Sequence, residues 1–281
     1  MTNIAKVCEK VFKLAGKAQC EILAEKRDSA LTRFADNVIS QNVASSSLNF
    51  TVRLLDGGRS AQFSFNQADD ASLKRSVASG LEILRRQKKD PALLPLAKPR
   101  PLPAGTNLYD RETAELTPAF RAAKAAELAK ACAKTGQVAC GTVENGVEGY
   151  TIANNLGVFA EHLESFVMHS VTVRDRAGSG WAEQPSHRVG EIDFKRLNDP
   201  ARAKAAASRA PREIKPGKYT VILEPNAAAA LLSYVGVYGF GGQLYNEGRS
   251  FTAGKLGGKV FSPLFTMEDN ALDGGAPGLP F

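Results

Sequence analysis

The stretch SLNFTVRLLDGGRSAQFSFN (residues 47–66) decides the fold class of this chain. Its first part alternates apolar and polar side chains, which is typical of a β-strand with one buried face. The turn signal DGG (56–58) follows, and a second extended segment comes after it. We therefore expect an antiparallel hairpin whose first strand buries Leu48, Phe50, Val52 and Leu54.

Further elements surround this hairpin in a regular order. Apolar residues at helical spacing predict helices over residues 4–15 and 69–87. Residues 20–26 alternate like a strand, and 31–43 is counted as the next extended segment. The first part of the chain is therefore predicted to contain a helix, four strands and a second helix.

The same order occurs a second time after a proline-rich connector. Residues 90–106 contain five prolines, a composition typical of a semi-stiff linker. A helix is predicted over 117–136, four extended segments over 137–184, and an alanine-rich helix over 200–210. Two α+β modules of related layout are indicated, consistent with an ancient duplication.

A third part begins after these modules. Residues 218–225 are predicted to form a short strand, and a central helix is predicted over 226–239 before glycine-rich turns. So short a piece is marginal alone, and we expect it to be incomplete or to complete its core on a partner. The predicted class is α+β with a truncated, mainly-β C-terminal domain. The expected boundaries are 1–89 for the N-terminal domain, 90–112 for the linker, 113–212 for the middle domain and 213–281 for the C-terminal domain.

Composition narrows the class of protein. No apolar run approaches about 20 residues, and the N-terminus lacks the uninterrupted apolar core of a signal peptide, so we expect a cytoplasmic protein without a membrane span. The net charge is +7, but no aromatic residues interleave the basic runs, which argues against nucleic-acid binding. The four cysteines form no C-x-x-C pair and are expected to stay reduced: Cys8, Cys20, Cys132 and Cys140.

Seven segments follow one another along the chain: LTRFADNVISQNV, TVRLLDGGRSAQFS, ANNLGVF, VTVRDRAGSGW, GKYTVILEPNAAAALLSYVGVYGFGG, GRSFTAGKLGGKVFSPLFTMEDN and GLPF. Taken in this order, they resemble the TldD/PmbA family, known in older usage as modulators of DNA gyrase. The resemblance implies a cytoplasmic peptidase system of two homologous subunits that enclose a chamber for unfolded or extended peptides. One subunit carries a zinc helix with the pattern H-E-x-x-x-H, and the other lacks the metal residues.

The segment LLSYVGVYGFGG (231–242) takes the place of that zinc helix. By the resemblance, the two histidine positions fall on Ser233 and Tyr238, and the glutamate position falls on Tyr234. Zinc prefers imidazole, thiolate or carboxylate ligands, and a hydroxyl binds comparably only after losing a proton at high pKa. The chain therefore resembles the metal-free PmbA (TldE) subunit, with no catalytic or metal residue of its own and zinc on the partner. Relative to the family, the strands that would bear the last ligand are missing after Phe281.

The remaining polar residues and glycines lack the patterns of a metal site, a serine nucleophile or a phosphate loop. The three histidines lack metal-ligand spacing and are expected to make ordinary hydrogen bonds: His162, His169 and His187. Ser233 lacks the G-x-S-x-G elbow of a nucleophile. The glycines after the helix lack the lysine of a phosphate loop and are read as helix termination. Candidate contacts to a peptide in the chamber are Tyr234, Tyr238, Gly241 and Gly242.

Three functions remain open from the sequence. The leading hypothesis is a non-catalytic partner subunit of a TldD/PmbA-type zinc metallopeptidase complex, inactive alone, bound to a TldD-like zinc subunit and to extended peptide, with a homo-oligomer as a further arrangement. The second is a regulatory binding protein that acts on DNA gyrase. The third is a peptidase whose active residues lie in the missing C-terminal part.

Overall fold

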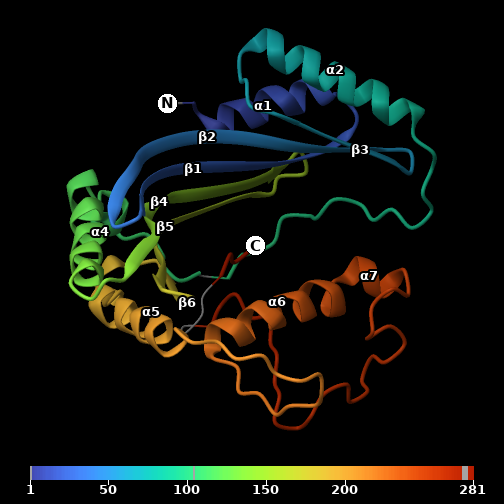
Figure 1. Ribbon diagram of the computed structural model, residues 1–281. Helices are drawn as coiled ribbons and strands as arrows, with labels where there is room; N and C mark the ends of the chain where they lie inside the picture. Colours follow the sequence, from blue (N-terminus) through green and yellow to red (C-terminus); the bar gives the residue numbers. More distant parts are fainter. Residues whose placement is uncertain (1, 104, 274–277) are drawn as a thin grey trace. The chain divides into compact units, whose positions relative to one another are not determined.

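A single antiparallel sheet organises the larger of two units in the computed structural model, which describes residues 2–103, 105–273 and 278–281. This unit contains the residues up to Arg209 and those from Ala271 on, and the second unit is Ala210–Asn270. Figure 1 shows the strands side by side in the order β3-β2-β1-β4-β5-β6. Their bounds are β1 (Gln19–Ala35), β2 (Val38–Asp56), β3 (Arg59–Phe65), β4 (Val138–Asn154), β5 (Phe159–Asp175) and β6 (Gly178–Ser186).

Helices flank each set of three strands. Side chains at the N-caps accept a backbone N–H three residues on, which satisfies a donor that the helix itself leaves free. These caps are Asn3, Asp69, Asp110, Thr117 and Asp193. The helices of this unit are α1 (Ile4–Ala15), α2 (Asp70–Arg86), α3 (Arg111–Ala114), α4 (Pro118–Ala133), the 3-10 helix η1 (Val189–Glu191) and α5 (Phe194–Ala207).

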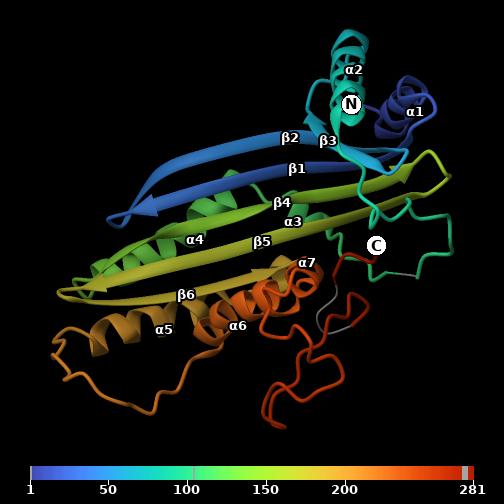
Figure 2. The same cartoon turned by 90° about the vertical axis from the view of Figure 1, so that its right-hand side faces the viewer.

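The four long helices α1, α2, α4 and α5 pack on one face of the sheet, because the apolar residues of each strand alternate. At one end of the long strands, α1 and α2 cover a cluster built around Ile22, Phe50 and Leu54. Toward the other end, α4 and α5 cover a cluster that includes Phe34 and Val171. Figure 2 shows the two helix pairs at these opposite ends. The opposite face carries ion pairs between strands instead, such as Arg27 Nη2 with Glu144 Oε1 at 2.9 Å.

The structure confirms the α+β class and the repeated layout, but each module has three strands and not four. Residues 20–26 and the start of 31–43 are one strand, β1, because both β2 and β4 pair with it through its polar middle at Arg27–Ser29. The chain turns at Asp36 and Asn37, both with positive φ. Likewise 137–143 and 148–154 are one strand, β4. The central β1–β4 pairing joins the two modules into one sheet.

The second unit contains two helices, α6 (Pro225–Phe240) and α7 (Gly242–Asn246). The predicted helix over 226–239 is thus confirmed. The predicted strand over 218–225 is wrong, and Ala210–Asn270, which the structure describes in full, holds no strand at all. A strand needs a neighbour to pair with its backbone groups, and this unit offers none, so the expectation of a mainly-β unit is not met there.

Within the described ranges, no helix is both long enough and apolar enough to span a bilayer.

Candidate functional site

The candidate site lies on α6. Pro225 occupies the first turn of the helix, where its missing N–H costs nothing, and Glu224 precedes it in an extended conformation. The helix ends at Phe240, and Gly241 returns to an extended conformation with ψ 122°. The predicted termination of the helix at these glycines is therefore confirmed.

Ser233, Tyr234 and Tyr238, the positions that the sequence resemblance assigns to a zinc motif, all lie on this helix. The Ser233 hydroxyl donates to the carbonyl of Ala230 at 2.8 Å, within the helix itself. The rings of Tyr234 and Tyr238 stack one turn apart, with centroids 6.2 Å apart and planes inclined by 4°. Both rings are exposed, by 65% and 60%. The helix thus presents a paired, exposed aromatic surface.

This donor set does not fit zinc. Ser233, Tyr234 and Tyr238 offer hydroxyl groups, whereas zinc sites use imidazole nitrogen, thiolate or carboxylate. In the part of the chain that the structure describes, no three or more His, Cys, Asp and Glu side chains gather as they would around a metal ion. We therefore derive no catalytic step through a metal on α6.

A second feature of α6 was missed by sequence reasoning. The carbonyl of Gly239 accepts hydrogen bonds from Ser250 Oγ at 2.5 Å and from Thr252 Oγ1 at 2.6 Å. A Cβ at Gly239 would lie 2.3 Å from the ring of Phe251, so glycine is required for this contact. The sequence marked this glycine as part of helix termination, but it also anchors the following turn to the helix. Among the candidate chamber residues, a Cβ at Gly241 would lie 2.7 Å from the carbonyl oxygen of Val237 in α6, whereas a Cβ at Gly242 would meet nothing within 4 Å.

The unit that carries α6 has little interior of its own. Within Ala210–Asn270, only Gly239 and Ser250 are buried. Apolar side chains such as Ile222, Val237 and Leu264 remain exposed. A helix that is apolar on all sides normally belongs in a core, whereas most of α6 is exposed within this unit.

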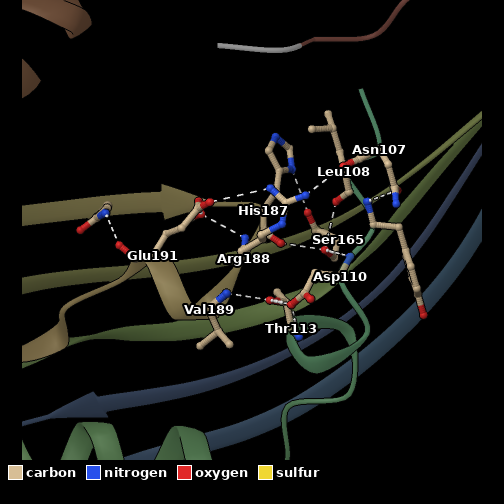
Figure 3. Close-up of polar contacts among 12 residues, drawn as sticks. Asn107, Leu108, Asp110, Thr113, Ser165, His187, Arg188, Val189 and Glu191 are labelled. Carbon is tan, nitrogen blue, oxygen red and sulfur yellow. Dashed lines mark hydrogen bonds and ion pairs between the residues drawn. The ribbon is translucent and has the colours of Figure 1, made fainter. Parts of the chain in front are cut away.

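A serine, a histidine and an aspartate come together elsewhere, where the connector meets β5 and β6 (Figure 3). The Ser165 hydroxyl donates to the carbonyl of His187 at 2.7 Å, and His187 Nδ1 faces the Ser165 carbonyl at 2.9 Å. The Asp110 carboxylate accepts from the N–H and the hydroxyl of Thr113. A nucleophilic triad requires serine Oγ to face the histidine ring and the aspartate to face its other nitrogen. These contacts are instead those of a structural junction.

The remaining titratable groups also have structural partners. His162 Nε2 lies 3.2 Å from Glu164 Oε2. Burial lowers the pKa of His169, whose Nδ1 faces the Thr142 carbonyl and whose Nε2 lies 2.8 Å from Asn198 Oδ1. Both partners are acceptors, so the neutral ring donates its single N–H to one of them. The expectation of ordinary hydrogen bonds is confirmed for these histidines.

All four cysteines are free thiols, as expected. Burial raises the pKa of Cys8 to about 11 and that of Cys20 to about 12. Because the thiolate is the nucleophile and the metal ligand, these two side chains behave as core residues.

Comparison with known proteins agrees with this architecture. Residues 20–84 match the PmbA/TldA metallopeptidase domain 1, and residues 216–281 match the PmbA/TldA metallopeptidase C-terminal domain. A search among curated proteins finds no match.

Three of the solved structures with a similar fold come from different organisms. A suspected DNA gyrase modulator from Bacteroides thetaiotaomicron is 20% identical, with a TM-score of 0.77 and 92% of this chain covered. A suspected modulator of a DNA gyrase from Thermotoga maritima is 16% identical, with a TM-score of 0.73 and 90% covered. TldE from Thermococcus kodakarensis is 16% identical, with a TM-score of 0.68 and 90% covered.

The alignments cover 62%, 59% and 58% of those three chains, so this chain spans about three fifths of their length. The order of the modules, the central helix and both family matches agree with one another. The chain therefore belongs to the TldD/PmbA family.

Proposed function

We propose that this chain is a non-catalytic partner subunit of a TldD/PmbA-type zinc metallopeptidase complex that acts on unfolded or extended peptides in the cytoplasm. The observation that carries the proposal is the set of hydroxyl side chains at Ser233, Tyr234 and Tyr238, where the family motif has two histidines and a glutamate. None of these groups supplies a neutral-pH zinc ligand or a general base for an attacking water.

In this proposal the homologous subunit holds the zinc, and the exposed apolar surface of α6 contributes to the wall of a shared chamber. The stacked rings of Tyr234 and Tyr238 offer a flat amphipathic surface for a peptide, with apolar faces and hydroxyl donors. Gly242, which has open space around its Cα, allows the backbone of a peptide to approach closely.

The first experiment measures zinc and peptidase activity together. The purified chain is expected to hold no stoichiometric zinc, and its mixture with a homologous H-E-x-x-x-H subunit is expected to hold about one zinc per pair and to cleave peptides. Tight zinc in the isolated chain that is lost in the Tyr234→Phe/Tyr238→Phe variant would contradict the proposal, because that variant removes only the two hydroxyl groups.

A second experiment tests the role of the tyrosines. In the complex, the Tyr234→Ala/Tyr238→Ala variant is expected to raise KM for a long unfolded substrate while the zinc content stays the same. Tyr219→Ala is the matched control, since Tyr219 is an exposed tyrosine of the same unit outside α6. An equal effect of the control on KM would remove the tyrosine pair from the substrate path.

One observation favours a second candidate function, regulation of DNA gyrase: the description of two structural relatives as suspected gyrase modulators. This function predicts direct association with gyrase in the absence of any peptidase subunit. Affinity capture of the full chain from a cell extract distinguishes the two proposals, since one predicts recovery of gyrase and the other predicts recovery of a homologous zinc subunit.

A further inference from the structure

Strand β2 has a long unpaired edge. β3 pairs with β2 from Phe50 to Asp56, whereas Val38–Asn49 has β1 as its single strand neighbour among the described residues. Figure 2 shows this part of β2 at the border of the sheet. At about 3.3 Å per residue the open edge is roughly 40 Å long, and alternate residues direct both backbone N–H and C=O away from β1.

The composition of this edge is unusual for an exposed strand. The sequence VISQNVASSSLN (38–49) contains no charged residue, proline or glycine. Val38 and Val43 are 66% and 45% exposed. Sheet edges that are not binding sites usually carry lysine, proline or inward charges, or remain short, because an open edge is a template for another strand.

The other edges of the same sheet are protected. β3 has seven residues. β6 contains Pro185 and packs closely against α5. Beyond the end of β6, Leu108 pairs with β5 at Glu164, and the Ser165 N–H donates to the Leu108 carbonyl at 3.1 Å. The open edge of β2 is therefore not a general property of this sheet.

We infer that the Val38–Asn49 edge binds an extended, proline-free peptide segment of low charge by β-strand addition. Backbone hydrogen bonds supply the recognition, and the small uncharged side chains of the edge impose little selection on sequence. The site lies on the sheet and not on α6, so it does not depend on the proposed role as a peptidase subunit.

A free peptide fits this edge better than a second copy of the chain does. β3 closes the edge at Phe50, where Phe65 pairs. Suppose that two copies pair through this edge as antiparallel strands related by a two-fold axis. The turn at Asp36 of one copy would then collide with β3 of the other copy, unless the axis passes through Val43 or a residue nearer to Val38. Such a pair would include Ser40, where the β1–β2 register shifts and the strand is irregular. Only Gln41–Ser45 could then pair regularly between the two copies. A peptide can use all of Gln41–Asn49.

The first test locates binding by hydrogen–deuterium exchange on the full chain. The probe is a fluorescein-labelled peptide of about nine alternating threonine and valine residues with a lysine at each end. Exchange is expected to slow within Val38–Asn49 when the probe is added. A probe that is N-methylated on alternate residues lacks the donors of one edge and is expected to give no slowing. Slowing confined to other segments would overturn the inference.

The second test measures affinity by fluorescence anisotropy. The Val43→Lys/Ser45→Lys variant places two charged, flexible side chains on the edge and is expected to weaken probe binding about fivefold. Ser79→Lys, on the exposed side of α2, is the matched control and is expected to leave the affinity unchanged within about twofold. Melting temperatures confirm that each variant is folded.

Two further outcomes contradict the inference. Equal affinity of the wild type and the lysine variant would show that the probe binds elsewhere. Slowed exchange in Val38–Asn49 that grows with protein concentration in the absence of probe would identify a second copy as the occupant. Neither outcome bears on zinc content or peptidase activity, so this inference and the proposed function can fail separately.

Discussion

Replacement of Gly180 by alanine tests how closely β6 and α5 pack. A Cβ at Gly180 would lie 2.1 Å from the carbonyl oxygen of Ala201 and 2.8 Å from the backbone nitrogen of Ala205, both in α5. Backbone atoms cannot rotate away as the end of a side chain can, so α5 must retreat by at least about 1 Å to restore a normal contact.

The size of the effect follows from what the retreat disrupts. Ala201 and Ala205 are completely buried against the sheet. A gap of 0.5–1 Å removes roughly a quarter to a half of the dispersion energy of each contact, and overpacking typically costs about 1–3 kcal/mol. We expect Gly180→Ala to lower the free energy of unfolding by about 2–3 kcal/mol, and the melting temperature by roughly 5–10 °C for a unit of this size.

Urea unfolding followed by tryptophan fluorescence suits this test, because Trp181 is the single tryptophan and is adjacent to Gly180. Its indole N–H donates to Ser170 Oγ on β5 at 3.3 Å, so its emission reports the β5–β6 contact. Gly190→Ala is the matched control, since a Cβ at Gly190 meets nothing within 4 Å. A loss below about 0.5 kcal/mol in Gly180→Ala, or an equal loss in the control, would refute the described packing of α5.

Three more predictions concern groups in both units. The lowered pKa of buried His169 means that the unfolded chain binds the proton more readily than the folded chain does. The free energy of unfolding should therefore be highest above about pH 6.5 and fall below it by up to about 1.4 kcal/mol per pH unit. His169→Gln should flatten this slope in urea titrations at about pH 5.5 and 7.5. With pKa values of about 11 and 12, Cys8 and Cys20 should not react with Ellman's reagent in the native protein at pH 8, but should react in guanidinium. Gly236→Ala, in α6 with open space around it, should raise the helix content measured by circular dichroism, and an unchanged spectrum would mean that α6 is not limited by helix propensity.

Local sequence patterns predicted where strands and helices occur better than where one strand ends and the next begins. The alternation from Leu48 to Leu54 identified β2, because half-buried strands have a two-residue period. The polar residues Arg27 and Asp28 looked like a break, yet they continue β1. Their environment depends on β4, more than 100 residues away, where Glu144 and Glu148 pair with Arg27. Such long-range pairs leave no signal in a short window.

The buried Arg121 shows the same limit inside a helix. It lies in the alanine-rich segment that the sequence identified as α4, where an arginine is normally solvated. In the structure its guanidinium donates to Asn145 Oδ1 at 2.6 Å and to the Leu116 carbonyl at 2.9 Å. Burial lowers its pKa, and neutral acceptors replace the carboxylate that a buried cation commonly has. The burial of Arg121 therefore depends on tertiary contacts and could not be predicted from the composition of the helix.

For the candidate site, sequence reasoning located α6 and the aromatic pair but not the attachment of the following turn. The shared face of Tyr234 and Tyr238 follows from helical periodicity alone. The hydrogen bonds of Ser250 and Thr252 to the Gly239 carbonyl depend on how the chain returns after α7, and no local pattern predicts that path.

The internal repeat strengthens the inference about the β2 edge. In the strand order β3-β2-β1-β4-β5-β6, β2 and β5 occupy equivalent positions on either side of the central pair. β5 is paired with Leu108 just beyond β6, and the buried Ser165 hydroxyl donates to the carbonyls of Leu108 and His187 at this junction. β2 has the same place in the other module, but no segment that the structure describes pairs with the outer backbone edge of Val38–Asn49, and these residues carry no charge. Since one architecture supports both a covered and an open strand, the openness of β2 is a property of its own sequence and not a consequence of the fold, as expected of a binding edge.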